Sequence, residues 1–285
     1  MKTALIILAA GKGTRMNSDL PKVLHPIAGE PMLIHALEAG TMLEPERTVA
    51  VAGHGAELVR SAALAHDATI KVVEQTEQLG TAHAVAQARD ALSGFDGMAL
   101  VLYGDTPFIR PETLENMQAA LAANDVVVLG FEAADPARYG RLVMDGQQLD
   151  RIVEFKDASD DERMITLCNS GVVACNADLL FDLIDAVDNN NASEEYYLTD
   201  IVGLARGRGL VSNRCHLRRM GNRRHQLSRR TGQSRGRLPN PRPCRTSGRR
   251  RDAHRPRHGV SGARYCNWPR YAGRTQRGLW SRCHS

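Results

Sequence analysis

The last 75 residues of this 285-residue chain lack four residue types that folded domains ordinarily use. Residues 211–285 contain no Lys, Glu, Ile or Phe, and one acidic residue, Asp252, against 21 Arg. A basic domain normally mixes Lys with Arg and keeps aliphatic residues for a core. An excess of Arg, Pro, Gly and Ser without them is typical of a GC-rich gene translated out of frame. We therefore look for the function in residues 1–210.

The chain also has no apolar run of membrane length and no cationic leader. The opening MKTALIILAAGKG is apolar for a few residues and then becomes rich in glycine, which predicts a buried strand. Only Cys168 and Cys175 precede residue 211, and the four later cysteines are spaced too irregularly for a zinc site. We expect a cytoplasmic protein that has no membrane partner.

Charge divides the chain in the same way. Residues 1–210 hold 31 Asp and Glu against 16 Lys and Arg, so the overall net charge of +5 describes neither part. We predict one folded domain over 1–210 and a disordered Arg-rich tail over 211–285, because so few aliphatic residues cannot offset the entropy of ordering. The alternative is a real basic extension that binds polyanions without specificity. The tail contains no recognisable nucleic-acid-binding module, so we expect no specific nucleic-acid partner.

Up to about residue 210, short β-branched runs alternate with helical spacing. Strands are predicted at Ala4–Leu8, Thr48–Ala52, Ile70–Val73, Ala99–Tyr103, Asp125–Phe131, Leu149–Glu154 and Gly171–Ala174. Helices are predicted at Pro31–Met42, Thr81–Ala91 and Ala177–Val187, and Pro111 marks a further helix start. This alternation predicts an α/β fold with a mostly parallel sheet covered by helices on both faces. In such sheets ligands bind beyond the carboxyl ends of the strands.

A glycine-rich loop, Leu8–Met16, directly follows the first predicted strand. Its glycines allow close backbone approach, and a turn with free N–H groups suits phosphate oxygens. The loop lacks the third glycine of GxGxxG and the GK[ST] ending of a Walker loop. It carries Arg15 instead, and Pro21-Lys22 follows. Two cations there would neutralise charge on a transferring phosphoryl group, whereas the alternative is an ordinary turn with solvated cations.

Other polar residues are predicted near strand ends. Asp105 follows a strand, where a carboxylate either holds Mg²⁺ together with phosphate oxygens or is simply solvated. Gln75 donates and accepts through one planar amide, as a pyrimidine edge requires. Glu154 and Asn169 suit sugar hydroxyls, although Glu154 beside Lys156 also fits a surface ion pair. The histidines form no pair with metal-ligand spacing, and we interpret them as structural or solvated: His25, His35, His54 and His83.

Six further motifs follow the glycine loop in order, within about residues 1–207. They are Glu74–Ala84, Leu102–Pro107, Tyr139–Arg141, Ile152–Ala158, Asn169–Gly171 and Glu195–Asp200. Together with the loop, they resemble the nucleotidyltransferases that make nucleoside-diphosphate sugars, and among these the N-acetylglucosamine-1-phosphate uridyltransferases. The resemblance implies a Rossmann-like nucleotidyltransferase fold.

The resemblance also implies a role for each matched residue. Arg15 and Lys22 would be the catalytic cations, and Asp105 would be the metal ligand. The residues implied to bind substrate are Leu8, Ala9, Ala10, Gly11, Gly13, Lys22, Gln75, Gly80, Thr81, Tyr103, Gly104, Gly140, Glu154, Asn169 and Tyr197. Among them, Gln75 and Gly80 would bind uracil. The sugar would contact Thr81, Gly140, Glu154 and Asn169, whereas Tyr197 fits packing equally well.

The implied reaction joins UTP and N-acetylglucosamine-1-phosphate. The sugar phosphate would attack the α-phosphorus of UTP in line, with Mg²⁺ as cofactor, and give UDP-N-acetylglucosamine and pyrophosphate. The product would serve peptidoglycan and lipopolysaccharide synthesis. In the family this domain is the amino-terminal half of a bifunctional enzyme, whose other half is a trimerising β-helix with acetyltransferase activity. No hexapeptide repeat of such a helix follows residue 210, so we expect no acetyltransferase activity and a monomer.

The chain departs from the family at the second Mg²⁺ ligand, an Asn in a Gly-[Ile/Val]-Asn segment beyond the Tyr-Tyr motif. Residues 220–226, back-translated and read one nucleotide later, permit Trp-x-Ile-x-Gly-Ile-Asn. This favours a frameshift near residues 207–212 and predicts a chain that binds UTP but turns over more slowly than a frame-restored one. Two alternatives stay open: a related nucleotidyltransferase for another sugar phosphate, and an inactive remnant with a polyanion-binding tail.

Overall fold

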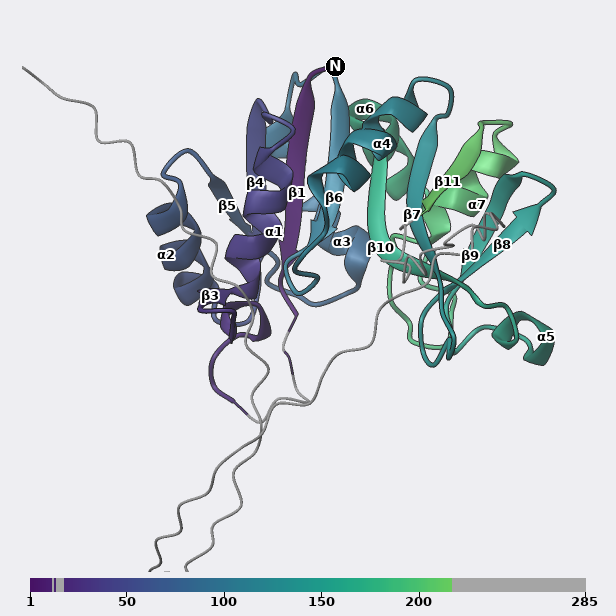
Figure 1. Ribbon diagram of the computed structural model, residues 1–285, viewed down its shortest axis with the longest axis horizontal. Helices are drawn as coiled ribbons and strands as arrows, with labels where there is room; N and C mark the ends of the chain where they lie inside the picture. The colour runs from purple at the N-terminus through teal and green to yellow at the C-terminus, as the bar shows by residue number, and fades with distance from the viewer. Residues whose placement is uncertain (12, 14–17, 217–285) are drawn as a thin grey trace, which may run out of the picture. The chain divides into compact units, whose positions relative to one another are not determined.

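The computed structural model describes residues 1–11, 13 and 18–216. Arg15 and most of the predicted tail, residues 217–285, lie outside the described residues. Within the described part, nine strands form one sheet, and seven of them follow the order β11-β7-β10-β6-β1-β4-β5 (Figure 1). These seven are β1 (Thr3–Ala9), β4 (Arg47–Ala52), β5 (Lys71–Glu74), β6 (Met98–Tyr103), β7 (Val126–Glu132), β10 (Leu167–Asn176) and β11 (Ser212–His216).

The sheet is mostly parallel, as predicted. β1 pairs in parallel with β4 and β6, β4 with β5, and β7 with β11. β8 (Arg141–Asp145) pairs with β9 (Gln148–Val153) and touches β10 at one position, which adds a hairpin to the sheet. β10 runs antiparallel to both β6 and β7, and the pairing of β8 with β9 and with β10 is antiparallel too.

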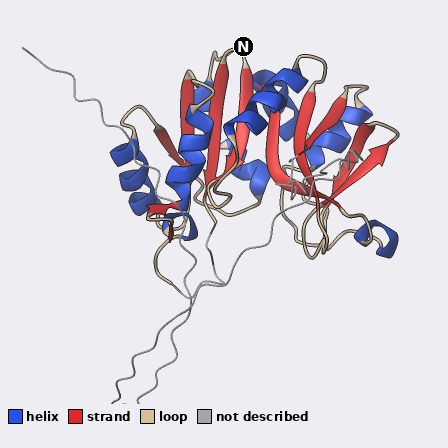
Figure 2. Ribbon diagram, in the orientation of Figure 1, coloured by secondary structure: helices blue, strands red, loops and turns tan. Residues whose placement is uncertain are grey.

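Helices cover both faces of the sheet (Figure 2). Alternate residues of β1 enter two separate cores, Ala4, Ile6 and Leu8 in one and Leu5, Ile7 and Ala9 in the other. The first core contains side chains of α3 (Thr81–Ala86), α6 (Ala177–Ile184) and α7 (Asp200–Gly207). The second contains those of α1 (Met32–Thr41), α2 (Ala56–His66) and α4 (Pro111–Leu121). A strand buried on both faces is apolar throughout, which explains the continuous TALIILA run.

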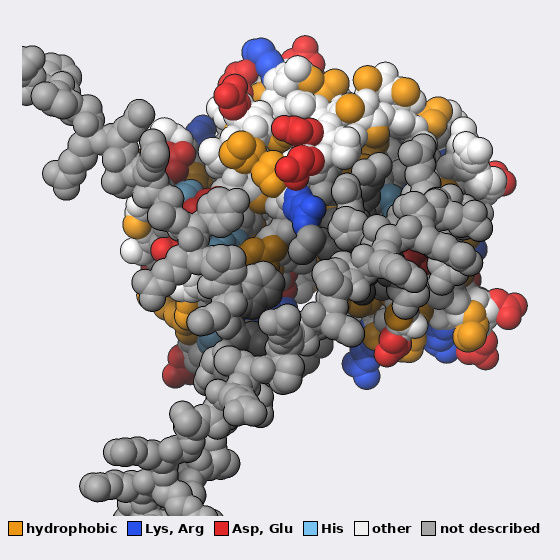
Figure 3. Space-filling view, in the orientation of Figure 1, with side chains coloured by type: hydrophobic (Ala, Val, Ile, Leu, Met, Phe, Trp, Pro, Cys, Tyr) orange, Lys and Arg blue, Asp and Glu red, His pale blue; other side chains and the backbone are white. Residues whose placement is uncertain are grey.

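On the part of the described surface visible in Figure 3, apolar side chains are scattered among charged ones. Apolar atoms are common on folded surfaces when they are dispersed, and the described part in view shows no large apolar patch. Three shorter helices complete the described fold: α5 (Asp160–Arg163) and the 3-10 turns η2 (Lys22–Leu24) and η3 (Asp90–Leu92). A two-stranded ribbon of β2 (Pro26–Ile27) and β3 (Glu30–Pro31) follows η2.

Two predicted helices are too long. The helix predicted over Thr81–Ala91 ends at Ala86 and is followed by η3, and the one predicted to Val187 ends at Ile184. β10 extends the predicted strand Gly171–Ala174 in both directions. The helices α2 and α7 and the strands β8 and β11 were not predicted. β11 lies just past residue 210 and pairs with β7, so a domain boundary at residue 210 would divide two paired strands.

Candidate active site

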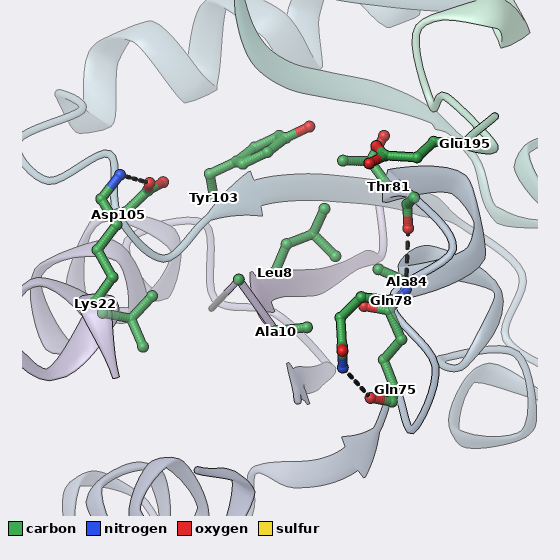
Figure 4. A pocket seen from close by; sticks show the side chains of 13 residues that line it. Leu8, Ala10, Lys22, Gln75, Gln78, Thr81, Ala84, Tyr103, Asp105 and Glu195 are labelled. Carbon is green, nitrogen blue, oxygen red and sulfur yellow. Dashed lines mark hydrogen bonds and ion pairs between the residues drawn. The ribbon is translucent and has the colours of Figure 1, made fainter. Parts of the chain in front are cut away.

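The carboxyl ends of β1, β5 and β6 border a cavity of about 270 Å³ (Figure 4). Because β6, β1, β4 and β5 are parallel neighbours, the segments that follow them meet at one edge of the sheet. Nine of the predicted site residues line the cavity: Leu8, Ala10, Gly11, Lys22, Gln75, Gly80, Thr81, Tyr103 and Asp105.

Lys22 and Asp105 form the charged end of this cavity (Figure 4). Lys22 Nζ donates to Asp105 Oδ2 at 2.5 Å, and the two side chains are 36% and 27% exposed. A Cβ atom on Gly13 would lie 2.8 Å from Lys22 Cβ, and φ at Gly13 is +59°. Both facts favour glycine at this position. Gly13 therefore lets the glycine-rich loop approach Lys22.

Gln75 lies at the opposite end of the cavity, beyond β5 (Figure 4). Its backbone N–H donates to Ala52 O at 2.8 Å, and its side-chain Nε2 donates to Gly80 O at 3.0 Å. Gln78 Nε2 donates to Gln75 O at 3.1 Å. These contacts from several segments fix a side chain that is only 3% exposed.

Tyr103 lies between the charged end and Thr81 (Figure 4). Its ring packs against Gly171, where φ is +90° and an added Cβ would come within 2.7 Å of Tyr103 Cε2. Burial, reinforced by the charge of Glu154, raises the pKa of Tyr103, so the hydroxyl stays protonated at neutral pH. Thr81 Oγ1 accepts a hydrogen bond from Leu198 N at 2.9 Å, which joins this wall to a distant part of the chain.

The segment around Gly80 docks on the segment around Tyr196. Tyr196 N–H donates to Leu79 O at 2.8 Å, and Ala82 N–H donates to Tyr196 O at 2.9 Å. Glu195 thereby reaches the cavity wall. The sequence motifs containing these residues therefore belong to one wall of one cavity.

Glu154 and Tyr197 line a second cavity of about 240 Å³. Thr199 Oγ1 donates to Glu154 Oε1 at 3.2 Å, while burial raises the pKa of Glu154. A Cβ atom on Gly140 would lie 3.3 Å from Glu154 Oε1. Gly140 O in turn accepts a hydrogen bond from Asn169 N at 2.9 Å, so three of the predicted sugar residues are neighbours.

The prediction that Asn169 ends a strand is wrong. Asn169 lies inside β10, where the register with β7 shifts between Asn169 and Val173. Its Oδ1 accepts a hydrogen bond from Gly171 N at 2.9 Å, and such a local side-chain contact is typical of a bulge. The strand therefore begins before Asn169, which the short apolar run at Gly171–Ala174 could not indicate.

Ala9 and Gly104 lie next to the first cavity but do not line it. Ala9 belongs to the core on the α1 side of the sheet, and Gly104 N–H donates to Leu8 O at 2.9 Å. The structure adds four lining residues that were not predicted: Val23, Gln78, Ala84 and Glu195. Gln78 and Glu195 lie inside recognised motifs, whereas the apolar Val23 and Ala84 carry no chemical signal in a sequence.

Among the described residues, no three His, Cys, Asp or Glu side chains gather as a metal cluster. Mg²⁺ usually takes one or two protein carboxylates and completes its shell with water and substrate phosphates. Asp105 fits this requirement, because its carboxylate borders the cavity and is partly exposed.

Residues 5–170 match the MobA-like NTP transferase domain. The chain belongs to this family. It is 71% identical over 212 residues to the Bifunctional protein GlmU of Roseobacter denitrificans, and 58% identical over 211 residues to that of Rhodospirillum rubrum. The alignments cover 74% and 73% of this chain but 47% and 46% of those proteins, so the chain spans about half the length of these relatives. The resemblance inferred from the motifs is thus confirmed.

Solved structures place the fold of this NTP transferase domain. It resembles UDP-glucose pyrophosphorylase complexed with UDP-glucose, with a TM-score of 0.62 and 19% identity over 75% of this chain and 90% of that one. The inositol-1-phosphate CTP transferase from T. maritima gives a TM-score of 0.61 and 17% identity over 75% and 84%. These likenesses concern the fold alone, and they confirm the predicted nucleotidyltransferase fold. No helix in the described ranges has the length and apolar character that a membrane span needs.

Gly80→Ala tests the docked wall of the NTP transferase domain. φ at Gly80 is +121°, and an added Cβ would lie 2.4 Å from Tyr196 O and 2.6 Å from Tyr196 N. Because backbone cannot rotate away like a side chain, we expect a loss of about 2–3 kcal/mol, or about 5–10 °C in Tm, by scanning calorimetry. Gly207→Ala is the control, since a Cβ atom added there, at the end of α7, would meet no described atom of another segment within 4 Å. Equal Tm values for the two variants would contradict the docking.

Asp200→Asn tests the acidic surroundings of the second cavity. Burial, followed by the charges of Asp188 and Glu154, raises the pKa of Asp200 from 3.8 to about 6. The carboxyl group of Asp200 therefore binds its proton more tightly in the folded state than in the unfolded state. As a result, the free energy of unfolding of the parent falls as the pH rises from about 4 to about 6. After a discount for solvent screening, we expect the variant to gain about 1 kcal/mol, or a few degrees in Tm, above pH 6 and nothing below pH 4.

The control for this variant is Asp178→Asn, an exposed aspartate in the first turn of α6. Like Asp200→Asn, Asp178→Asn removes a carboxylate from the first turn of a helix, but the carboxylate of Asp178 is exposed. Thermal unfolding of the parent and both variants between pH 4 and pH 8 compares them. A Tm difference between Asp200→Asn and the parent that stays constant with pH would exclude the burial of Asp200 as its cause.

Proposed function

We propose that the chain is a uridyltransferase that joins UTP and N-acetylglucosamine-1-phosphate to give UDP-N-acetylglucosamine and pyrophosphate. One observation carries this proposal: a single cavity has Lys22 and Asp105 at one end, beside the glycine-rich loop, and the amide of Gln75 at the other (Figure 4). A nucleoside triphosphate has the same polarity, with phosphates at one end and a base that forms hydrogen bonds at the other. The similarity to GlmU proteins over this part of the chain supports the choice of substrates.

At the end with Lys22, the backbone N–H groups of the glycine-rich loop would bind the triphosphate. Lys22 neutralises negative charge that builds up as the α-phosphorus is attacked, and we assign Arg15 the same task. An oxygen of the sugar phosphate forms the new bond to that phosphorus, and the bond to the β-phosphate oxygen breaks, so pyrophosphate leaves with the electron pair. The nucleophile is already an anion, so no general base is needed.

Asp105 would hold Mg²⁺ together with phosphate oxygens of the nucleotide, and the ion would supply further charge neutralisation there. The Lys22–Asp105 ion pair keeps both groups at the cavity until they are needed. When a nucleotide and a divalent cation bind, Lys22 gains the phosphates and Asp105 gains the cation. Each of these groups carries more charge than the side chain that it replaces. We therefore expect the pair to separate when substrate binds.

At the sugar side, Gly140, Glu154 and Asn169 would face the N-acetylglucosamine, with Tyr197 nearby. A carboxylate accepts from sugar hydroxyls and an amide can bridge two of them. Tyr103 connects this group to the nucleotide cavity, because it lines that cavity and the charge of Glu154 contributes to the raised pKa of its hydroxyl. The product would be a precursor for the cell envelope. We also propose that the chain has no acetyltransferase activity.

Pyrophosphate release by the full chain tests the function. The chain is incubated with Mg²⁺, UTP and N-acetylglucosamine-1-phosphate, and in parallel with glucose-1-phosphate or glucosamine-1-phosphate as matched acceptors. We expect release with the N-acetylated sugar well above the other two, and UTP binding in calorimetry. Equal release with glucose-1-phosphate would favour a nucleotidyltransferase for another sugar, and a failure to bind UTP would overturn the proposal.

A further inference from the structure

The amide of Gln75 is fixed by two acceptors of the protein. Its Nε2 lies 3.0 Å from Gly80 O and 3.0 Å from His83 Nδ1. A carbonyl oxygen can only accept, so the nitrogen end of the amide must face Gly80. Since Nε2 carries two N–H groups, the second is directed to His83 Nδ1, which must then be the unprotonated ring nitrogen.

This arrangement uses both N–H groups of the Gln75 side chain inside the protein. Gly80 O has no spare capacity either, because it also accepts the helical hydrogen bond from Ala84 N at 3.1 Å. Oε1 is the polar atom of this amide left for a ligand in the cavity. A carbonyl oxygen presented there accepts a hydrogen bond and cannot donate one.

Such an acceptor distinguishes the two pyrimidines. Uracil presents an N3–H donor between two carbonyl oxygens, whereas cytosine presents N3 as a lone pair. An amide rotated by 180° would offer Nε2 and favour cytosine. The orientation of the Gln75 amide therefore decides which base is bound, and an unpaired or opposed polar group at a reading site costs affinity strongly.

We propose that His83 is a positioning residue that selects uracil over cytosine by fixing the amide orientation of Gln75. The inference rests on the proposed reading of the base by Gln75. His83 itself belongs to α3, where Gln87 Nε2 donates to its backbone oxygen at 3.0 Å. Its side chain is not among the residues that line the cavity, so it acts through Gln75 and has no contact with the base.

The test compares UTP and CTP, which share the same triphosphate and sugar and differ at the edge that Gln75 would read. Calorimetric Kd values are measured for the full chain, for His83→Leu and for His83→Asn. Leucine removes the acceptor, while the Oδ1 atom of asparagine can replace Nδ1 as an acceptor. We expect the CTP-to-UTP ratio of Kd values to fall by about three- to tenfold in His83→Leu, the worth of about one hydrogen bond, and to stay within about twofold of the parent in His83→Asn.

A purely structural role would weaken both nucleotides equally and leave the ratio unchanged, and that result would overturn the inference. If His83→Leu fails to fold, His83→Gln replaces it, because the longer side chain carries its oxygen past the Nδ1 position. The ratio should then fall in His83→Gln and stay in His83→Asn, and equal ratios would overturn the inference. A parent chain that binds UTP and CTP equally would instead refute the proposed uracil specificity itself.

Discussion

Replacing Lys22 with alanine is expected to lower pyrophosphate release about 10²–10⁴-fold while changing Tm by no more than about 2 °C. The large kinetic effect follows from the position of Nζ, 2.5 Å from Asp105, at the end of the cavity where we propose that the phosphates bind. The small thermal effect follows because both side chains of the ion pair are partly exposed, and such pairs contribute about 0–1 kcal/mol. Initial rates at saturating UTP and scanning calorimetry give the two numbers.

Lys2→Ala is the matched control for this variant. Lys2 Nζ also pairs with a carboxylate, Glu46 Oε2 at 3.2 Å, and its side chain is 64% exposed. It precedes β1, at the end of the strand opposite the glycine-rich loop. The control should keep full activity. Unchanged turnover in Lys22→Ala, or a parallel loss in both variants, would remove Lys22 from the catalytic site.

Arg141→Met is expected to lower the free energy of unfolding by about 3 kcal/mol or more. Arg141 is 1% exposed, and its guanidinium donates to backbone carbonyls of four residues: Pro136 at 3.3 Å, Ala137 at 3.1 Å, Arg163 at 3.2 Å, and Tyr139. Methionine matches the length of the stem but supplies no donor, so several buried carbonyls lose their partner. Denaturant unfolding measures the change.

Arg151→Met provides the contrast on the adjacent strand. Arg151 is exposed and pairs with Asp150 at 2.7 Å and Glu162 at 2.8 Å. Loss of such surface pairs costs about 0–1 kcal/mol. If the two Met variants unfold at the same denaturant concentration, the carbonyl contacts of Arg141 contribute no more to stability than the surface ion pairs of Arg151. A loss confined to Arg141→Met would show that one cation secures the loop before Gly140.

Strands whose positions are all filled by buried apolar residues could be predicted closely. β1 and β6 are of this kind, and both were predicted within about one residue. β11 has the sequence SNRCH, and its place in the sheet depends on backbone pairing with β7, for which side chains give no signal. α2 follows Gly55 in a left-handed conformation, without a side-chain cap to mark its start.

The candidate site divides in a similar way. Residues that follow strands, such as Gln75 and Asp105, could be predicted because parallel strands bring their carboxyl ends together. Contacts between distant segments could not. Lys22 and Asp105 are separated by 83 positions, and Thr81 and Leu198 by 117. Their proximity is a product of the whole fold, and neither spacing nor propensity encodes it locally.

The central position of β10 has a consequence for the newly made chain. β10 lies between β6 and β7 and pairs with both, yet it is synthesised after both of them. Until residue 176 leaves the ribosome, the edges of β6 and β7 that pair with β10 have no partner. Unpaired strand edges are templates for other chains, so the interval between the synthesis of β7 and β10 is the time at which a nascent chain most needs a chaperone.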